Sequence, residues 1–112
     1  MRFEGFNWDI GNEKKCEKHG LSKVEIEELF SRKLFVTPDI KNSISEERFL
    51  ALGQNAEKRP MIVIFTFREI NGAKLIRPIS ARYMHEKEVR KYEKTFKKNK
   101  RRSVLLSPGK TK

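Results

Sequence analysis

The run Met-Ile-Val-Ile-Phe-Thr-Phe-Arg-Glu-Ile-Asn-Gly-Ala-Lys-Leu-Ile-Arg-Pro-Ile-Ser, residues 61–80, contains the clearest strand and turn signals in this chain. Its first seven residues are almost all apolar, which predicts a central strand with both faces covered. Asn71-Gly72 is typical of a two-residue β-hairpin, so Lys74–Ser80 is predicted to return as an antiparallel partner. Pro78 cannot donate a backbone hydrogen bond and indicates an edge position or a bulge.

Further strands are predicted on the N-terminal side of this hairpin. Leu34–Thr37 is short and apolar and is stopped by Pro38, while Glu47–Gly53 alternates its side chains between two faces. The polar residues 39–45 between them are predicted to form a loop. Residues 2–6 also alternate polar and apolar side chains, which predicts a short first strand.

The first of three predicted helices is polar and spans Gly11–His19. Asn7 or Asp9 can cap its beginning, and Gly20 follows its end, where glycine is favoured. The lysine and histidine in its last turn suit the negative end of the helix dipole.

Two more helices are predicted, one before the strands and one after them. Ser22 and Glu25 have the spacing of a capping box for a helix over Lys23–Arg32. Its apolar face is predicted to consist of Val24, Ile26, Leu29 and Phe30. The last helix runs from His85 to about Lys97, with one apolar stripe formed by Val89, Tyr92 and Phe96.

Helices and hairpin-connected strands in separate blocks predict an α+β fold, with an antiparallel sheet, two N-terminal helices and one C-terminal helix. A length of 112 residues suits one domain, which we assign to residues 1–96. Residues 97–112 form a basic tail that contains seven Lys or Arg and no acid. The apolar island Val104-Leu105-Leu106 in this tail could pack on the domain or bind a partner.

Composition limits the classes of binding partner and the cellular compartment that we expect. The formal net charge is +11, so polyanions are the natural partners, either nucleic acid or an acidic protein. The single cysteine, Cys16, cannot form an internal disulfide. Since no apolar run approaches the length of a membrane span and no signal peptide is evident, we expect a soluble cytoplasmic protein.

The run Arg-Pro-Ile-Ser-Ala-Arg-Tyr-Met-His, residues 77–85, is predicted to lead from the end of a strand into a helix. Arg77, Arg82, Tyr83 and His85 would therefore lie around one corner. Arginine binds phosphate through paired hydrogen bonds, and histidine can move a proton beside it. The rest of the sequence contains no metal-ligand cluster, nucleotide-binding glycine loop or thiol pair. We therefore expect no metal or cofactor and take this corner as the first candidate site.

Five short motifs, in order and with plausible spacing, resemble the BrnT family of toxins. The motifs are Phe6-Asn7-Trp8-Asp9, Lys18-His19-Gly20 followed by Ser22, Glu46-Glu47-Arg48-Phe49, Thr66-Phe67-Arg68 and Ile79-Ser80-Ala81-Arg82. That family comprises the toxin halves of bacterial type II toxin–antitoxin pairs, and its fold is similar to that of RelE ribonucleases. The resemblance covers about residues 3–94 and leaves the tail outside.

The resemblance implies a small endoribonuclease that cleaves messenger RNA and thereby inhibits translation and growth. It also implies a BrnA-like antitoxin that neutralises the toxin, and a complex of both that binds operator DNA through the antitoxin's DNA-binding domain. Because the body of this chain is basic, we expect the toxin-binding region of the antitoxin to be acidic.

RNA can be cleaved without a metal when its 2′-hydroxyl attacks the adjacent phosphate, which requires charge stabilisation and two proton transfers. Arg82 is our first candidate for stabilising the phosphate, although it could instead pair with Glu86 or Glu88. Arg68 is the second candidate, and the alternative is a strand-end residue paired with an acidic neighbour. We therefore expect Arg68 and Arg82 to act together on the phosphate.

His19 is the candidate for general acid or base, although it could simply finish its helix. Glu47 could orient Arg48 or Arg68, act as a base, or be a plain exposed carboxylate. These two residues complete the catalytic set that we expect, together with the two arginines.

The remaining candidates would contact RNA. They are Arg77, Tyr83, His85, Lys18 and Trp8. Tyr83 and His85 could also share proton transfer, whereas Lys18 could be a solvated helix-end cation. Trp8 could stack on a base or belong to the core.

Two other functions remain open at the level of sequence. The same basic cleft could hold RNA without cutting it, or the chain could be an inactive structural partner in a toxin–antitoxin complex. Binding and cleavage both need positive charge, so composition does not separate them.

Overall fold

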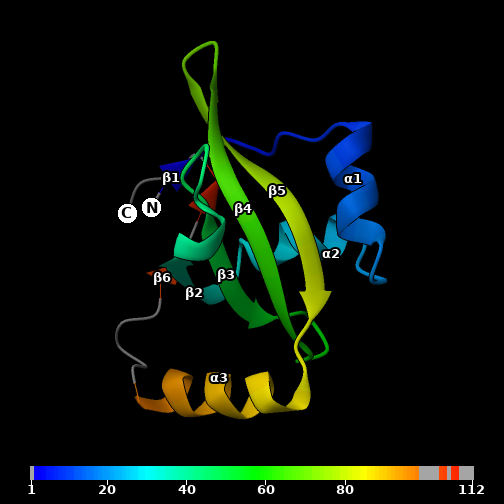
Figure 1. The fold of residues 1–112 in the computed structure, drawn as a ribbon, viewed down its shortest axis with the longest axis vertical. Helices are drawn as coiled ribbons and strands as arrows, with labels where there is room; N and C mark the ends of the chain where they lie inside the picture. The colour runs from blue at the N-terminus through cyan, green and yellow to red at the C-terminus, as the bar shows by residue number, and fades with distance from the viewer. Residues whose placement is uncertain (1, 99–103, 106, 109–112) are drawn as a thin grey trace.

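The computed structural model describes residues 2–98, 104–105 and 107–108, and it confirms the α+β prediction. The helices are α1 (Ile10–Glu17), α2 (Lys23–Leu29) and α3 (Glu86–Lys98), with one 3-10 turn, η1 (Ile40–Asn42). The strands are β1 (Arg2–Phe3), β2 (Lys33–Pro38), β3 (Phe49–Gln54), β4 (Pro60–Ile70), β5 (Ala73–Tyr83), β6 (Val104–Leu105) and β7 (Ser107–Pro108). The main sheet has the order β5-β4-β3-β2-β6 and every neighbouring pair is antiparallel (Figure 1).

The long β4–β5 hairpin forms as its sequence predicts. Asn71 and Gly72 have φ values of 52° and 82°, the left-handed conformations that a tight two-residue turn requires. The register shifts near Pro78, where Ile79 is the extra residue of a bulge. Pro78 therefore lies at a bulge and on the outermost strand of the main sheet, and both parts of its prediction are confirmed.

The N-terminal segment runs along the outer side of β5. The predicted strand over residues 2–6 is regular only at β1, and Phe6 forms a single bridge with Ile76. The backbone N–H of Asn7 donates to the Ile76 carbonyl at 2.8 Å, and that of Glu4 donates to the Lys74 carbonyl at the same distance. This edge of β5 is therefore paired between Lys74 and Ile76, which limits strand addition by another chain there.

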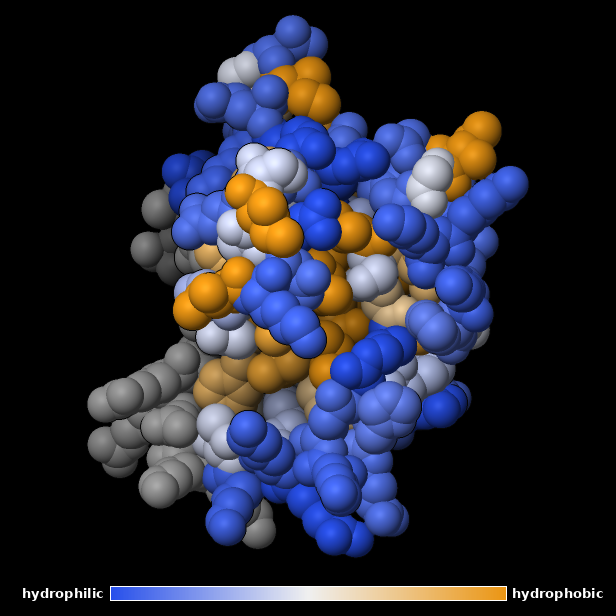
Figure 2. Space-filling view, viewed as in Figure 1, coloured by the Kyte–Doolittle hydropathy of each residue, from blue (hydrophilic) through white to orange (hydrophobic). Residues whose placement is uncertain are grey.

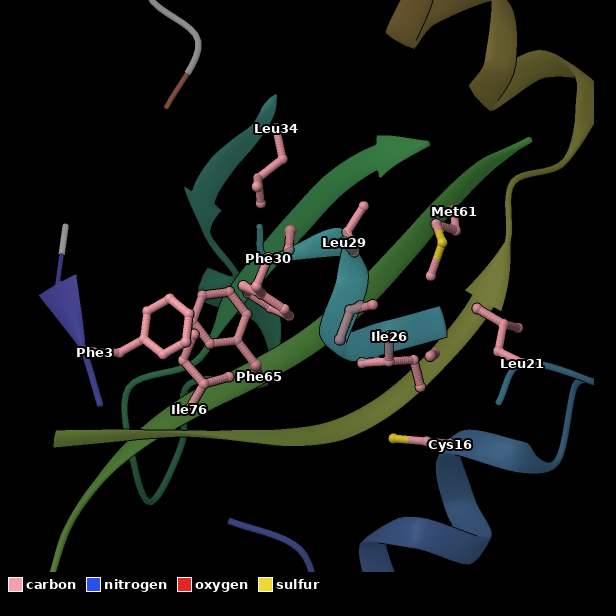
Figure 3. Packing of buried hydrophobic residues seen from close by; sticks show 13 residues of the cluster. Phe3, Cys16, Leu21, Ile26, Leu29, Phe30, Leu34, Met61, Phe65 and Ile76 are labelled. Carbon is pink, nitrogen blue, oxygen red and sulfur yellow. The ribbon is translucent and has the colours of Figure 1, made fainter. Parts of the chain in front are cut away.

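Helices α1 and α2 cover one face of the sheet and form the core with it (Figure 3). Phe30 from the end of α2 packs edge-on against Phe65 of β4, with ring centroids 5.1 Å apart. Fully buried residues around them include Phe3, Cys16, Leu21, Ile26, Leu29, Leu34, Met61 and Ile76. Burial raises the pKa of the Cys16 thiol to about 11, so this cysteine is a protonated core residue.

The predicted caps are present at both N-terminal helices. Asp9 and Asn12 form a capping box at α1, and Ser22 and Glu25 form one at α2.

One residue that was predicted for the core is not buried. Val24 is 63% exposed, so its assignment to the apolar face of α2 was wrong. Two residues of helix turn the chain by about 200°, which places Val24 almost opposite the buried Ile26.

The other face of the sheet is only partly covered, so the prediction that both faces of β4 are buried was wrong. Ile62 and Ile64 point away from α1 and α2 and are half-buried. Helix α3 lies across one end of the strands (Figure 1), and its buried Tyr92 packs edge-on against Phe35 at 6.2 Å. A groove of about 540 Å³ remains between α3 and the strands.

The end of the chain pairs with both sheets through its backbone. In β6, Val104 pairs with Leu34 and Leu105 pairs with Lys33, while β7 runs parallel to β1. This pairing favours the alternative in which the apolar island docks on the domain. Most of the tail's basic residues lie outside the described part of the chain. Within that part, none of the helices is both long and apolar enough to cross a membrane.

Candidate functional site at the end of strand β5

Arg82 lies near the end of β5, on the face of the sheet that carries the groove. Its guanidinium donates two hydrogen bonds of 2.8 Å to the two carboxylate oxygens of Glu88 in the first turn of α3. Glu88 also accepts a 2.8 Å bond from the backbone N–H of His85, so it caps the helix as well. The paired bonds from Arg82 are the main reason that the pKa of Glu88 falls to about 2.

Tyr83, the next residue, points to the opposite face of β5 and meets the beginning of α2. Its hydroxyl donates to a carboxylate oxygen of Glu25 at 2.7 Å, and the Asn55 side-chain amide donates to the same oxygen at 2.7 Å. Burial opposes ionisation of Glu25, but these two hydrogen bonds outweigh it and lower its pKa. Burial and the adjacent carboxylate raise the pKa of Tyr83, which keeps its proton on the hydroxyl.

Arg59 stacks on Tyr83, and sequence reasoning missed it. The centre of its guanidinium lies 3.5 Å from the ring centroid, and the side chain is exposed. Among the described residues its guanidinium N–H groups have no hydrogen-bond acceptor, in contrast to those of Arg82. The signal that could have found it is the strand register, because Met61 pairs with Tyr83 and Arg59 precedes Met61 by two residues on the same face.

Arg68 lies far from Arg82, and the structure does not bring these two residues together. Across the β4–β5 pair Arg82 stands opposite Ile62, six residues before Arg68, which corresponds to about 20 Å along the strand. Arg68 pairs instead with Glu46 at 2.7 Å, and Arg48 pairs with the same carboxylate at 3.4 Å. The alternative of an acidic partner thus describes the observed environment of Arg68.

Glu46, rather than the predicted Glu47, holds the two arginines near the hairpin. The Glu47 side chain is exposed, and only its backbone carbonyl is engaged, by the Thr66 hydroxyl at 2.7 Å. Glu46 lies in a bend before β3 and the exposed Glu47 follows it, so an error of one position exchanges the pairing residue for the solvated one.

Arg77 and Trp8 are built into the framework. The Arg77 guanidinium donates to the side chains of Asn7 and Asp9 at 2.8 Å each, which ties β5 to the beginning of α1. Trp8 is half-buried against the core, and its indole N–H donates to Glu27 at 2.8 Å. Trp8 therefore packs against the core, as the alternative to an RNA contact expects.

The two histidines and Lys18 are exposed. Lys18 and His19 lie in the turn after α1, on the helical side of the sheet. No hydrogen bond or ion pair connects His19 to Arg68 or Arg82 among the described residues. The His85 side chain is exposed at the beginning of α3, one residue beyond the end of the Arg82–Tyr83–Met84 run.

The end of β5 therefore carries cations and proton-carrying groups on both of its faces, with Arg82 on the groove face and Tyr83 and Arg59 on the helical face. An exposed guanidinium with unused donors suits a phosphate oxygen, and the phenol and imidazole can exchange protons. No group of three or more His, Cys, Asp or Glu side chains that could hold a metal ion occurs in the described residues. We refer to Arg59, Tyr83, Arg82 and His85 as the strand-end cluster.

Comparisons with known proteins identify the family of this chain. A search of curated proteins found no match to the chain. The model of one protein family, described as the ribonuclease toxin BrnT of type II toxin–antitoxin systems, matches residues 8–88. The match covers most of the chain and includes all of the strand-end cluster. It also confirms the resemblance seen in the sequence motifs, and an antitoxin partner follows from the nature of these systems. This chain belongs to the BrnT family of ribonuclease toxins.

Proposed function

We propose that this protein is a metal-independent endoribonuclease that cleaves messenger RNA in the cytoplasm and thereby inhibits translation and growth. A cognate, BrnA-like antitoxin would neutralise it, and the complex would bind operator DNA through the antitoxin. The observation that carries the proposal is the strand-end cluster, where an arginine with unused donors stacks on a tyrosine hydrogen-bonded to a carboxylate.

The reaction needs no metal if the protein meets three requirements. The RNA 2′-hydroxyl attacks the adjacent phosphorus and loses its proton, while the bond to the 5′-oxygen breaks and that oxygen gains a proton. Negative charge builds on the phosphate oxygens between these events. Donors placed at such a charge commonly contribute a factor of about a hundred or more to the rate.

Arg59 and Arg82 are our candidates for stabilising that charge, and they lie on opposite faces of the end of β5. Arg59 is exposed and its donors are unused within the described residues, so it can bind a phosphate without breaking an ion pair. Arg82 must exchange its Glu88 carboxylate for a phosphate, and both partners are about one-third exposed, at 37% and 36%. Exposed ion pairs are weak, so this exchange costs little.

Tyr83 and the two histidines are our candidates for proton transfer. The raised pKa of Tyr83 keeps it protonated at neutral pH, as a donor to the leaving oxygen must be. His85 belongs to the strand-end cluster, whereas His19 lies in the turn after α1. Because the chain has only two histidines, single substitutions can decide which one takes part.

The test is cleavage of a defined single-stranded RNA by the purified protein in the presence of EDTA. We expect cleavage to persist and to leave 2′,3′-cyclic phosphate ends, because the attacking nucleophile is the RNA's own hydroxyl. Arg59→Ala and Arg82→Ala should each lower the rate about a hundred-fold. Arg90→Ala, which removes an exposed arginine paired within α3, is the matched control. Loss of activity in EDTA, or 5′-phosphate ends, would contradict the proposal.

One observation favours a second candidate function. Both terminal nitrogens of Arg82 are occupied by Glu88, which suits a module that binds RNA weakly without cutting it. Binding of intact RNA by the wild type, with no cleavage products over many hours, would select this alternative.

A further inference from the structure

The groove on the open face of the sheet takes part in the proposed chemistry only at its Glu88 end, where Glu88 pairs with Arg82. Its floor comes from β2, β3 and β4, and one wall comes from α3. The residues that line it are mostly apolar: Phe35, Val36, Thr37, Leu50, Leu52, Ile62, Met84, Glu88, Lys91, Tyr92 and Thr95. In Figure 2, hydrophobic residues (orange) gather in a hollow above α3.

The connection between two strands of the groove also carries exposed apolar residues. Thr37 and Leu50 pair across β2 and β3 and both line the groove. The connection between these strands carries Ile40 and Ile44, which are 84% and 91% exposed. An apolar patch that a monomer leaves uncovered commonly marks a protein interaction site.

The charge of the groove indicates the kind of partner. Among its lining residues only Glu88 and Lys91 are charged, and Glu88 is neutralised by Arg82. Lys91 therefore leaves the groove positive, on a chain whose formal net charge is +11. A second copy of this chain would bring like charges together, whereas a partner with carboxylates beside apolar anchors would complement the surface.

RNA is a poor occupant for the same surface. Nucleic acids are bound through phosphate contacts and through bases stacked on exposed rings. This floor presents branched aliphatic side chains such as Leu50, Leu52 and Ile62, and its one ring among the described residues, Phe35, packs edge-on against Tyr92. Such side chains fit the apolar face of an amphipathic helix.

We infer that the groove between α3 and the open face of the sheet binds an amphipathic segment of the antitoxin, with apolar anchors and flanking acidic residues. This inference rests on the toxin–antitoxin function proposed above. The bound segment would lie beside the Arg82–Glu88 pair at one end of the groove. Neutralisation would then follow from blocking access to Arg82, without any contact with Arg59 on the other face.

Substitutions in α3 test the inference with little risk to the fold. Lys91→Glu and Thr95→Glu change exposed residues that line the groove. The matched control is Lys94→Glu, which makes the same charge change on the same helix outside the groove. Leu50→Asp places a charge in the floor, and circular dichroism would establish that the variant folds.

The measurement is calorimetric affinity for the recombinant cognate antitoxin. We expect Lys91→Glu and Thr95→Glu to weaken binding about tenfold and Leu50→Asp about a hundred-fold, with less than a twofold change for Lys94→Glu. The two α3 groove variants should still cleave RNA and should resist neutralisation.

Three results would overturn the inference. These are wild-type affinity in Lys91→Glu and Thr95→Glu, no binding of the antitoxin by the wild type, or a wild-type dimer that these variants dissociate. Failure of the proposed function looks different. A protein that binds antitoxin through the groove but never cuts RNA would refute the ribonuclease proposal and leave the groove assignment intact.

Discussion

The two faces of β4 carry similarly apolar side chains but differ in how deeply these side chains are buried. Met61, Val63 and Phe65 point toward α1 and α2 and have no exposed surface. Ile62 and Ile64 alternate with them and remain half-buried on the open face. The comparison shows that a strand can be equally apolar on both sides although the fold supplies a full second layer on only one. The closed face should carry the stability, and the open face should be available to a partner.

The most severe test of this difference compares Phe65→Ala with Ile64→Ala. Phe65 is fully buried against Phe30 and Phe49, so we expect its removal to lower the free energy of unfolding by about 3–5 kcal/mol. Ile64→Ala on the half-buried face should cost about 1–2 kcal/mol, because less apolar area is lost. Urea denaturation measures both, and equal losses would mean that the two faces contribute alike.

A second test adds volume to the closed face. A Cβ atom at Gly53 would lie 2.7 Å from a methyl carbon of Leu29 and 3.2 Å from the Cβ of Leu34. Gly53→Ala should therefore lower the free energy of unfolding by about 1–3 kcal/mol through overpacking.

The control for this crowding is Gln54→Ala, one residue along the same strand and half-buried. It should change the unfolding free energy by less than about 0.5 kcal/mol. A Gly53→Ala protein as stable as the wild type would show that α2 can move away from the sheet without loss.

Removal of residues 99–112 tests whether the short strands β6 and β7 contribute to the stability of the fold. Because β6 pairs with β2 and β7 pairs with β1, we expect the thermal midpoint to fall by about 5 °C, equivalent to about 1 kcal/mol. Truncation after Gly109 retains both short strands and should leave the midpoint unchanged. An unchanged midpoint in the longer truncation would instead support a basic tether that serves only to bind RNA or antitoxin.

The smallest expected effect concerns the ion pair at the end of the groove. Glu88 has a folded pKa of about 2 against an ordinary value of 4.5, so its stabilising effect is full above pH 4.5 and is lost as the pH falls toward 2. Both side chains are about one-third exposed, so screening limits the effect to about 0.5–1 kcal/mol. Glu88→Gln should remove this increment at pH 7 and flatten the pH dependence of unfolding between pH 4.5 and 2. An unaltered profile would show that the Arg82–Glu88 pair contributes nothing measurable.

Local signals predicted most of the fold. The Asn71-Gly72 turn and the Ser22–Glu25 capping box depend on neighbouring residues alone, and both are present. The cover of each sheet face depends instead on where distant helices pack. The open face of β4 was therefore not evident from its almost uniformly apolar sequence.

The candidate site was predicted less well, for a related reason. Arginines mark basic surfaces, but their carboxylate partners are set by three-dimensional register. Glu46 takes the place expected of Glu47, and Arg59 reaches Tyr83 only because β4 and β5 align them. Arg59, whose donors have no acceptor among the described residues, lies outside the run of residues 77–85.

Cys16 can report how often the packing of α1 on the sheet opens. It is the only cysteine, it lies wholly inside the core between α1 and the sheet, and its thiol stays protonated. A thiol reagent therefore reacts with it only when α1 separates locally from the sheet. The rate of modification measures the frequency of this local opening. Slower labelling in the presence of antitoxin or RNA would show how much each ligand suppresses this local opening. No introduced probe is needed for such an experiment, so the kinetics of the native chain can be followed directly.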